Sequence, residues 1–206
     1  MKRRAVFLDR DGTINKDVGY PNSYSAINIF PYSFEAVRKL NQSGFLAVII
    51  TNQSGVGRGL IIEKNLEEIH RQMKEAFSRH GARFDGIYYC PHYPFSPSPE
   101  YRENCQCRKP LPGMALKAAR ELHIDLKNSY MVGDKVEDML FGLNIGARPI
   151  LCLTGFGRES LPKLEEKGVK PAFVAKNLLE AVNWILREEE KINPDDGQNE
   201  KEKTRR

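Results

Sequence analysis

The size, composition and charge of the chain are those of a single globular domain. It has 206 residues, of which 40% are hydrophobic and 29% charged, and it contains no apolar run of membrane-spanning length. The net charge of +5 suits an anionic ligand, either a phosphate ester or a nucleic acid. Its basic residues are not interleaved with aromatic ones in a stripe or a recognition helix, so we do not expect a nucleic-acid partner.

The two ends of the chain carry little apolar sequence. Lys2-Arg3-Arg4 is followed by a short apolar run that stops at Asp9, so we expect no export signal and a cytoplasmic protein. Its four cysteines should then stay reduced. We also expect a monomer. Residues 187–206 hold one aliphatic side chain and no aromatic one, too few to offset the entropy of ordering. We expect one domain over residues 1–187 and a disordered charged tail over residues 188–206.

Hydrophobic runs alternate with helical patterns along the domain. Strands are predicted at residues 4–8, 45–50, 87–90, 129–133 and 149–153. Helices are predicted from Ser33 as the capping residue to Ser43, and at residues 63–80, 113–123, 136–143 and 178–186. Residues 90–112, with six prolines, are predicted to be irregular. This alternation predicts an α/β fold of the Rossmann type, a parallel sheet covered by helices on both faces.

Polar residues follow three of the predicted strands at the point where each ends. They are Asp9, Thr51 and Asp134. Ligands of such sheets bind beyond the carboxyl ends of the strands, so the three side chains meet if their strands are neighbours. The first strand must then be central.

These residue types fit phosphoryl transfer. Asp9 and Asp134 offer the hard oxygen ligands that Mg²⁺ prefers, and the ion would offset the charge of a phosphate monoester. Asp9 could then attack phosphorus and form an aspartyl-phosphate. Asp11 lies on the same side of an extended chain and could act as acid and base.

Three further groups could contact the phosphate. Thr51 supplies a hydroxyl, Lys109 a cation, and Arg108 a bidentate anion contact. Each catalytic candidate also has a structural interpretation: Asp11 could shape a turn, Thr51 could cap one, and Lys109 could lie in solvent. Their joint placement at strand ends favours the catalytic interpretation.

The proline-rich segment carries a second metal pattern. Cys90, His92, Cys105 and Cys107 supply three thiols and an imidazole, a set that suits a closed, structural Zn²⁺ site. Bound zinc would hold the neighbouring Lys109 in place. The alternative is a set of unrelated reduced cysteines and a loop histidine.

The strand-end residues resemble the four motifs of the haloacid dehalogenase superfamily. The matching segments are Asp9-Arg-Asp11-Gly-Thr13, Thr51-Asn52, Lys109, and Gly133-Asp134 with Asp138 four residues on. The resemblance implies that Asp9, Asp11, Thr51 and Lys109 are catalytic and that magnesium binds Asp9, Asp134 and the main-chain carbonyl of Asp11. It implies that Asp138 orients Lys109. Lys135 is a substrate contact, a salt-bridge residue or a surface lysine. Both positions where superfamily members carry a cap domain hold only loops, so an open site without a cap is expected.

The cysteine loop narrows the resemblance to heptose bisphosphate phosphatases and the related histidinol phosphatases. Residues 17–20 and 51–59 look like the heptose forms of the substrate loops, although Val18 replaces a frequent histidine. The resemblance implies hydrolysis of the 7-phosphate of a heptose 1,7-bisphosphate; histidinol phosphate, and a non-enzymatic zinc-stapled basic binding module, remain alternatives. The residues expected to bind a phosphorylated sugar are Asp17, Gly19, Tyr20, Asn52, Gln53, Ser54, Arg58, Arg108 and Lys135.

Overall fold

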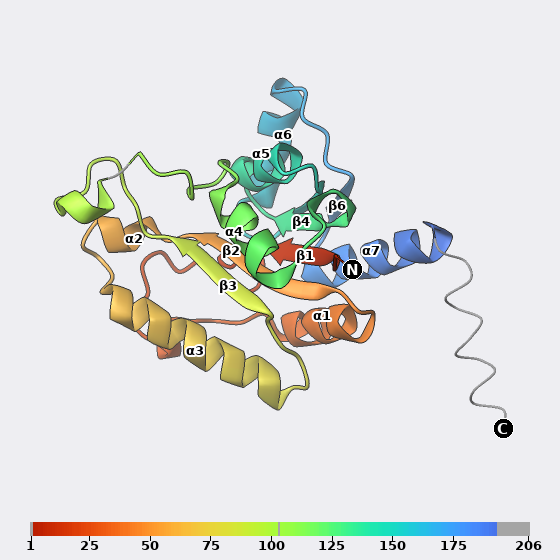
Figure 1. Ribbon diagram of the computed structural model, residues 1–206, viewed down its shortest axis with the longest axis horizontal. Helices are drawn as coiled ribbons and strands as arrows, with labels where there is room; N and C mark the ends of the chain where they lie inside the picture. Colours follow the sequence, from red (N-terminus) through yellow and green to blue (C-terminus); the bar gives the residue numbers. More distant parts are fainter. Residues whose placement is uncertain (1, 103, 193–206) are drawn as a thin grey trace.

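A computed structural model describes residues 2–102 and 104–192, in which six parallel strands form one sheet (Figure 1). The strand order is β3-β2-β1-β4-β5-β6, so the first strand is central, as predicted. The strands are β1 (Ala5–Leu8), β2 (Leu46–Asn52), β3 (Gly86–Cys90), β4 (Tyr130–Gly133), β5 (Arg148–Cys152) and β6 (Phe173–Ala175).

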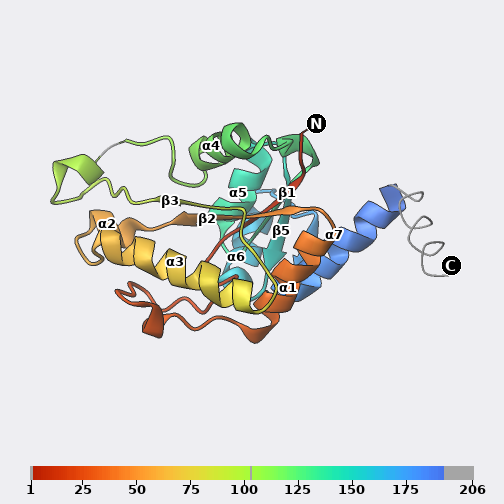
Figure 2. The ribbon, with the colours of Figure 1, turned by 60° about the horizontal axis from the view of Figure 1, so that its bottom comes forward.

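Helices cover both faces of this sheet (Figure 2). One face packs against α1 (Pro31–Gln42), α3 (Glu63–Arg79) and α7 (Leu178–Ile192). The other packs against α4 (Gly113–Leu122), α5 (Val136–Asn144) and α6 (Gly157–Glu166). The short helix α2 (Ser54–Gly57) follows β2, and single 3-10 turns lie at Tyr24–Ala26, Pro99–Tyr101 and Leu126–Asn128. The predicted α/β class is confirmed. None of the described helices is long and apolar enough to cross a membrane.

The position of β1 at the centre of the sheet explains why its sequence is apolar throughout. Val6 and Leu8 pack into the core under α1, α3 and α7, while Ala5 and Phe7 pack into the core under α4 and α5. All four side chains are fully buried, as is usual for a parallel strand covered on both faces. Leu8 pairs with Ile49 of β2 and Val132 of β4, so the residues that follow these strands emerge at one edge.

Two details of the helices differ from the sequence prediction. Helix α1 begins at Pro31, which suits a first helical turn because proline has no N–H to leave unpaired. Ser33 is therefore not its cap; its hydroxyl donates to the carbonyl of Ile14. Helix α6 and strand β6 were not predicted, because α6 contains Pro162 and the three residues of β6 are mostly half-buried at the sheet edge.

The predicted tail begins too early. Helix α7 continues to Ile192, five residues past the expected domain boundary at 187. Glu189 explains the difference: it pairs with Arg4, and it accepts a hydrogen bond of 2.6 Å from the hydroxyl of Tyr130. The prediction relied on the small number of apolar residues in this segment, which gives no information about polar contacts such as those of Glu189. The rest of the predicted tail, residues 193–206, lies outside the described residues.

Candidate active site

An open cleft of about 650 Å³ lies at the carboxyl ends of the central strands. Its lining includes all four predicted catalytic groups: Asp9 and Asp11 after β1, Thr51 near the end of β2, and Lys109 from the proline-rich segment. Asp138 of α5 also lines the cleft. The sheet therefore gathers side chains that are up to 129 residues apart in the sequence into one place.

Lys109 forms the centre of an ion-pair network. Its Nζ donates to Oδ1 of Asp9 at 2.7 Å, to Oδ1 of Asp138 at 2.5 Å and to the carbonyl of Ile50 at 3.0 Å. Burial acts to lower the pKa of Lys109, but the two carboxylates outweigh it and raise that pKa. Lys109 is therefore a fixed cation. Its backbone is held as well, because the Asn52 amide both accepts from its N–H and donates to its carbonyl.

Asp134 lies fully buried beside Asp9, in a space that two glycines leave open. Its Oδ2 accepts the backbone N–H of Phe156 at 2.7 Å, whereas its buried Oδ1 has no hydrogen-bond partner among the described residues. A Cβ atom at Gly12 would lie 2.2 Å from Oδ2 of Asp134, and one at Gly155 would lie 2.1 Å from it. Both glycines have positive φ, so they form a close-fitting wall that other residues could not form.

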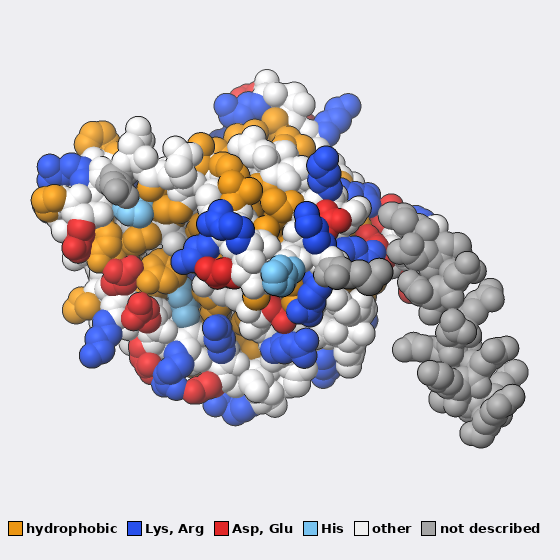
Figure 3. Space-filling view, viewed as in Figure 1, with side chains coloured by type: hydrophobic (Ala, Val, Ile, Leu, Met, Phe, Trp, Pro, Cys, Tyr) orange, Lys and Arg blue, Asp and Glu red, His pale blue; other side chains and the backbone are white. Residues whose placement is uncertain are grey.

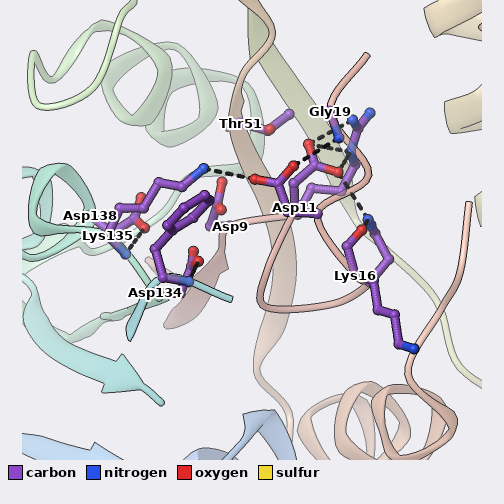
Figure 4. Close-up of polar contacts among 12 residues, drawn as sticks. Asp9, Asp11, Lys16, Gly19, Thr51, Asp134, Lys135 and Asp138 are labelled. Atoms are coloured by element: carbon purple, nitrogen blue, oxygen red, sulfur yellow. Dashed lines mark hydrogen bonds and ion pairs between the residues drawn. The ribbon is translucent and has the colours of Figure 1, made fainter. Parts of the chain in front are cut away.

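The carboxylates of Asp9, Asp134 and Asp138 carry more negative charge than Lys109 offsets (Figure 4). Burial, together with the neighbouring acids, raises the pKa of Asp134 to about 8; burial, opposed by Lys109, raises the pKa of Asp9 to about 6. An added cation would favour their ionised forms. The unpartnered Oδ1 of Asp134 and this excess of hard oxygen donors fit a divalent cation such as Mg²⁺.

Asp11 is held by polar groups on both of its oxygens. Asn15 donates to Oδ1 at 2.9 Å, Gln53 donates to Oδ2 at 2.8 Å, and the guanidinium of Arg10 reaches Oδ2 at 2.7 Å. Burial acts to raise the pKa of Asp11, but Arg10 outweighs it and lowers that pKa. The amide of Gln53 also donates to the hydroxyl of Thr51, which links the two predicted catalytic side chains.

The predicted substrate residues fall into two groups. Arg58 does not line the cleft; it is exposed and its guanidinium stacks on the ring of Tyr93 at 3.7 Å, and its expected contact with a second phosphate stays a prediction. Lys135 lines the cleft and pairs with Asp17 at 3.2 Å. The predicted substrate residues found in the cleft are Asp17, Gly19, Tyr20, Asn52, Gln53, Ser54, Arg108 and Lys135.

The predicted zinc ligands meet in a single cluster. Sγ of Cys107 lies 3.0 Å from Sγ of Cys90 and 3.2 Å from Nδ1 of His92, and Sγ of Cys105 lies 3.5 Å from that of Cys90. No disulfide links them, since all four cysteines of the chain are free. The hydrogen bond between Cys107 and Cys90 lowers the pKa of Cys107 and raises that of Cys90, because the two thiols share a proton. The donor set and spacing fit one tetrahedral ion.

Several site residues were not predicted. Arg10 and Asn15 contact Asp11, and His70 contacts Arg10. The Gly155–Phe156 turn contacts Asp134. The contact of Arg10 with Asp11 could have been suspected from the sequence, because Arg10 lies between Asp9 and Asp11. The others depend on contacts between distant segments, for which the sequence held no signal.

The face that α3 and β3 present carries side chains of mixed character. Figure 3 shows lysine and arginine side chains intermingled there with acidic and apolar ones.

Comparison with known proteins places this site in a family. Residues 106–181 match the HAD-hydrolase-like family model. The chain is 46% identical over 153 residues to D-glycero-beta-D-manno-heptose-1,7-bisphosphate 7-phosphatase of Yersinia pestis, covering 73% of this chain and 81% of that one. The chain belongs to the haloacid dehalogenase-like phosphatases, in the heptose-bisphosphate branch. This family assignment agrees with the predicted motifs.

Two further family members extend the match over most of the chain. The enzyme of the same name from Vibrio cholerae is 40% identical over 188 residues, 91% of this chain and 98% of that one. The crystal structure of D,D-heptose 1,7-bisphosphate phosphatase from B. bronchiseptica, complexed with magnesium and phosphate, superposes with a TM-score of 0.79 at 34% identity. It covers 90% of this chain and 99% of the other.

Proposed function

We propose that this protein is a Mg²⁺-dependent phosphatase that removes the 7-phosphate of D-glycero-D-manno-heptose 1,7-bisphosphate and leaves the 1-phosphate in place. The observation that carries the proposal is Asp9, a buried carboxylate held by Lys109 at the open end of the central strand. The relatives from Yersinia pestis and Vibrio cholerae are named heptose 1,7-bisphosphate 7-phosphatases, and the superposed crystal structure is of a heptose 1,7-bisphosphate phosphatase complexed with magnesium and phosphate. The free thiols of the cysteine cluster suit the cytoplasm, where the activity would take place.

The first step forms an aspartyl-phosphate. Lys109 occupies Oδ1 of Asp9, which leaves Oδ2 to attack the phosphorus of the 7-phosphate. The bond between phosphorus and the sugar oxygen breaks, and Asp11 gives its proton to that oxygen. The dianionic substrate favours the protonated form of Asp11 for this step, because a nearby negative charge raises the pKa of a carboxylic acid.

The second step releases phosphate. Asp11, now ionised and held by Arg10, takes a proton from a water molecule that attacks the phosphorus of the aspartyl-phosphate. The bond between phosphorus and Asp9 breaks, and the free carboxylate returns. The hydroxyl of Thr51 donates to a phosphoryl oxygen in both steps. The N–H groups of Lys109 are taken up by Asp9, Asp138 and the carbonyl of Ile50, so its cation offsets the phosphoryl charge from beside Asp9.

Magnesium would be held by Asp9, Asp134 and the main-chain carbonyl of Asp11. It would supply charge compensation for the phosphoryl group and its nucleophile. Asp138 instead fixes Lys109 and accepts the backbone N–H of Lys135 at 3.0 Å. These assignments separate the metal ligands from the residue that orients the catalytic lysine.

The wall formed by Gly155 gives a prediction about metal affinity. G155A places a methyl group within contact of the Asp134 carboxylate and should displace it, so Mg²⁺ should bind about tenfold or more weakly. Calorimetric titration with Mg²⁺ measures this directly. G168A is the matched control, because Gly168 also has positive φ but no atom lies within 4 Å of its added Cβ. Equal Mg²⁺ affinity in both variants contradicts the assigned role of Asp134.

Zinc in the cysteine cluster would be structural. Cys90, His92, Cys105 and Cys107 would fill all four positions of a tetrahedral ion and leave none for substrate. Cys107 is two residues from Lys109, so the cluster would fix the start of the segment that delivers the catalytic lysine. Arg108 lies between them and lines the cleft.

A substrate comparison in the presence of Mg²⁺ tests the proposed function. We expect the α or β anomer of heptose 1,7-bisphosphate to give the highest kcat/KM, and histidinol phosphate and a 3′-phosphorylated oligonucleotide to give values lower by about 10² or more. Preference for histidinol phosphate would move the protein to the neighbouring branch. Absence of hydrolysis in every case would contradict the proposal.

A further inference from the structure

A charged side chain, Arg10, is among the largest fully buried groups of the described residues. Removing a guanidinium from water costs several kcal/mol unless hydrogen bonds replace its hydration. Here Nε lies 3.1 Å from both oxygens of Asp11, Nη2 lies 2.7 Å from Oδ2, and Nη1 lies 3.1 Å from Nε2 of His70. Arg10 therefore connects the acid/base carboxylate with a histidine of helix α3.

The pairing of Arg10 with its neighbour in sequence requires a turn. Adjacent residues of a strand point to opposite faces. Directly after β1 the chain turns, and the Arg10 carbonyl accepts the backbone N–H groups of Ile14 at 2.9 Å and Asn15 at 3.2 Å. The turn brings the two side chains together, but the long arginine side chain keeps several rotamers open unless another contact fixes it. His70 provides that contact.

His70 lies on the buried face of α3, with 6% of its surface exposed. Burial and the Arg10 cation lower the pKa of His70 to about 3, so the imidazole is neutral. A guanidinium has donors only, so Nε2 of His70 must accept from Nη1 and the ring proton must reside on Nδ1. The contact has one direction and one tautomer, which makes it a specific geometric constraint on the guanidinium.

We propose that His70 is a positioning residue for the phosphatase reaction: it holds Arg10 so that the guanidinium fixes both oxygens of Asp11. The inference rests on the proposed function, because it requires Asp11 to transfer protons. Asn15 and Gln53 contact one oxygen each, whereas Arg10 reaches both. Without His70, the guanidinium can turn and the carboxylate loses its alignment with the leaving oxygen and with the attacking water.

Three substitutions of His70 separate the role of the acceptor from that of packing. H70L removes the acceptor. H70Q keeps an amide oxygen at the distance of Nε2, and H70N places one nearer the backbone, too short to reach Arg10. With heptose bisphosphate we expect H70L and H70N to lower kcat about ten- to hundredfold, with KM within about threefold, and H70Q to stay within about threefold of the unaltered protein.

An activated substrate gives a readout that loss of packing alone would not produce. Nitrophenolate leaves p-nitrophenyl phosphate without a proton, so only the hydrolysis of the aspartyl-phosphate then needs Asp11. We expect H70L to release about one nitrophenolate per chain in a burst, followed by a slow steady rate. If H70L does not fold, the burst is measured on H70N.

The control is H80L. His80 follows the last residue of α3, where its ring stacks on Phe34 and its Nδ1 contacts the carbonyl of Ala76, and it does not line the cleft. H80L should leave kcat unchanged, and thermal unfolding reports whether each variant is folded. If the unaltered protein is active and H70L matches it within about twofold, or if H70Q loses as much as H70L, the inference about His70 is overturned. An unaltered protein without phosphatase activity overturns the proposed function and this inference with it.

Discussion

Replacing Asp9 by asparagine is expected to lower kcat by about 10⁴-fold or more while the substrate still binds. An amide oxygen can accept the hydrogen bond from Lys109, so the cleft keeps its shape, but it cannot form the bond to phosphorus. Single-turnover assays on D9N measure the chemical step, and calorimetry with heptose bisphosphate measures binding.

The matched control for this variant is D125N. Asp125 precedes β4 at the opposite end of the sheet, where it accepts a hydrogen bond from Asn128. We expect D125N to retain full activity. Turnover by D9N above about 1% of that of the unaltered protein would show that another group attacks phosphorus.

Loss of Cys107, a proposed zinc ligand, is the second change with a large expected effect. Between β3 and α4 the described residues, 91–102 and 104–112, contain one short 3-10 turn and no other helix or strand, so the ion would supply much of the folding free energy of this segment. C107S should lose about one zinc per chain, lower the free energy of unfolding by several kcal/mol and reduce kcat, because Lys109 is two residues away. Metal analysis and thermal unfolding measure the first two effects.

The control for C107S is C152A. Cys152 is a fully buried core residue of β5 and has no place in the cluster. Its variant should keep the zinc content of the unaltered protein. A folded, reduced preparation of the unaltered protein without zinc would contradict the site.

The strand-end residues were predictable because their signal is local. β1 is buried on both faces, so its sequence is a short apolar run, and the polar residues that follow it mark the carboxyl edge of the sheet. The same reasoning predicted the placement of Thr51 in the cleft and of Asp134 beside Asp9. Parallel pairing of the three strands in register then determined that their following residues converge.

What the sequence could not predict depends on contacts between distant segments. In the sequence, nothing distinguishes His70 from its neighbours on helix α3. The fold brings its Nε2 to 3.1 Å from Nη1 of Arg10. The sequence of the Gly155–Phe156 turn does not indicate a role in the site, because its contact with Asp134 depends on the fold. The direction of the Arg58 side chain also depends on a distant contact, its stacking on Tyr93, and its expected contact with a second phosphate stays a prediction.

The most direct consequence of the proposed function is that one particular phosphate, the 7-phosphate, is removed. Phosphorus NMR of heptose 1,7-bisphosphate, incubated with the protein and Mg²⁺, follows the two phosphates separately. We expect the 7-phosphate signal to be replaced by that of inorganic phosphate while the 1-phosphate signal persists. When Mg²⁺ is chelated, we expect both phosphate signals of the substrate to remain. Loss of the 1-phosphate, or persistence of both signals with Mg²⁺ present, would contradict the account.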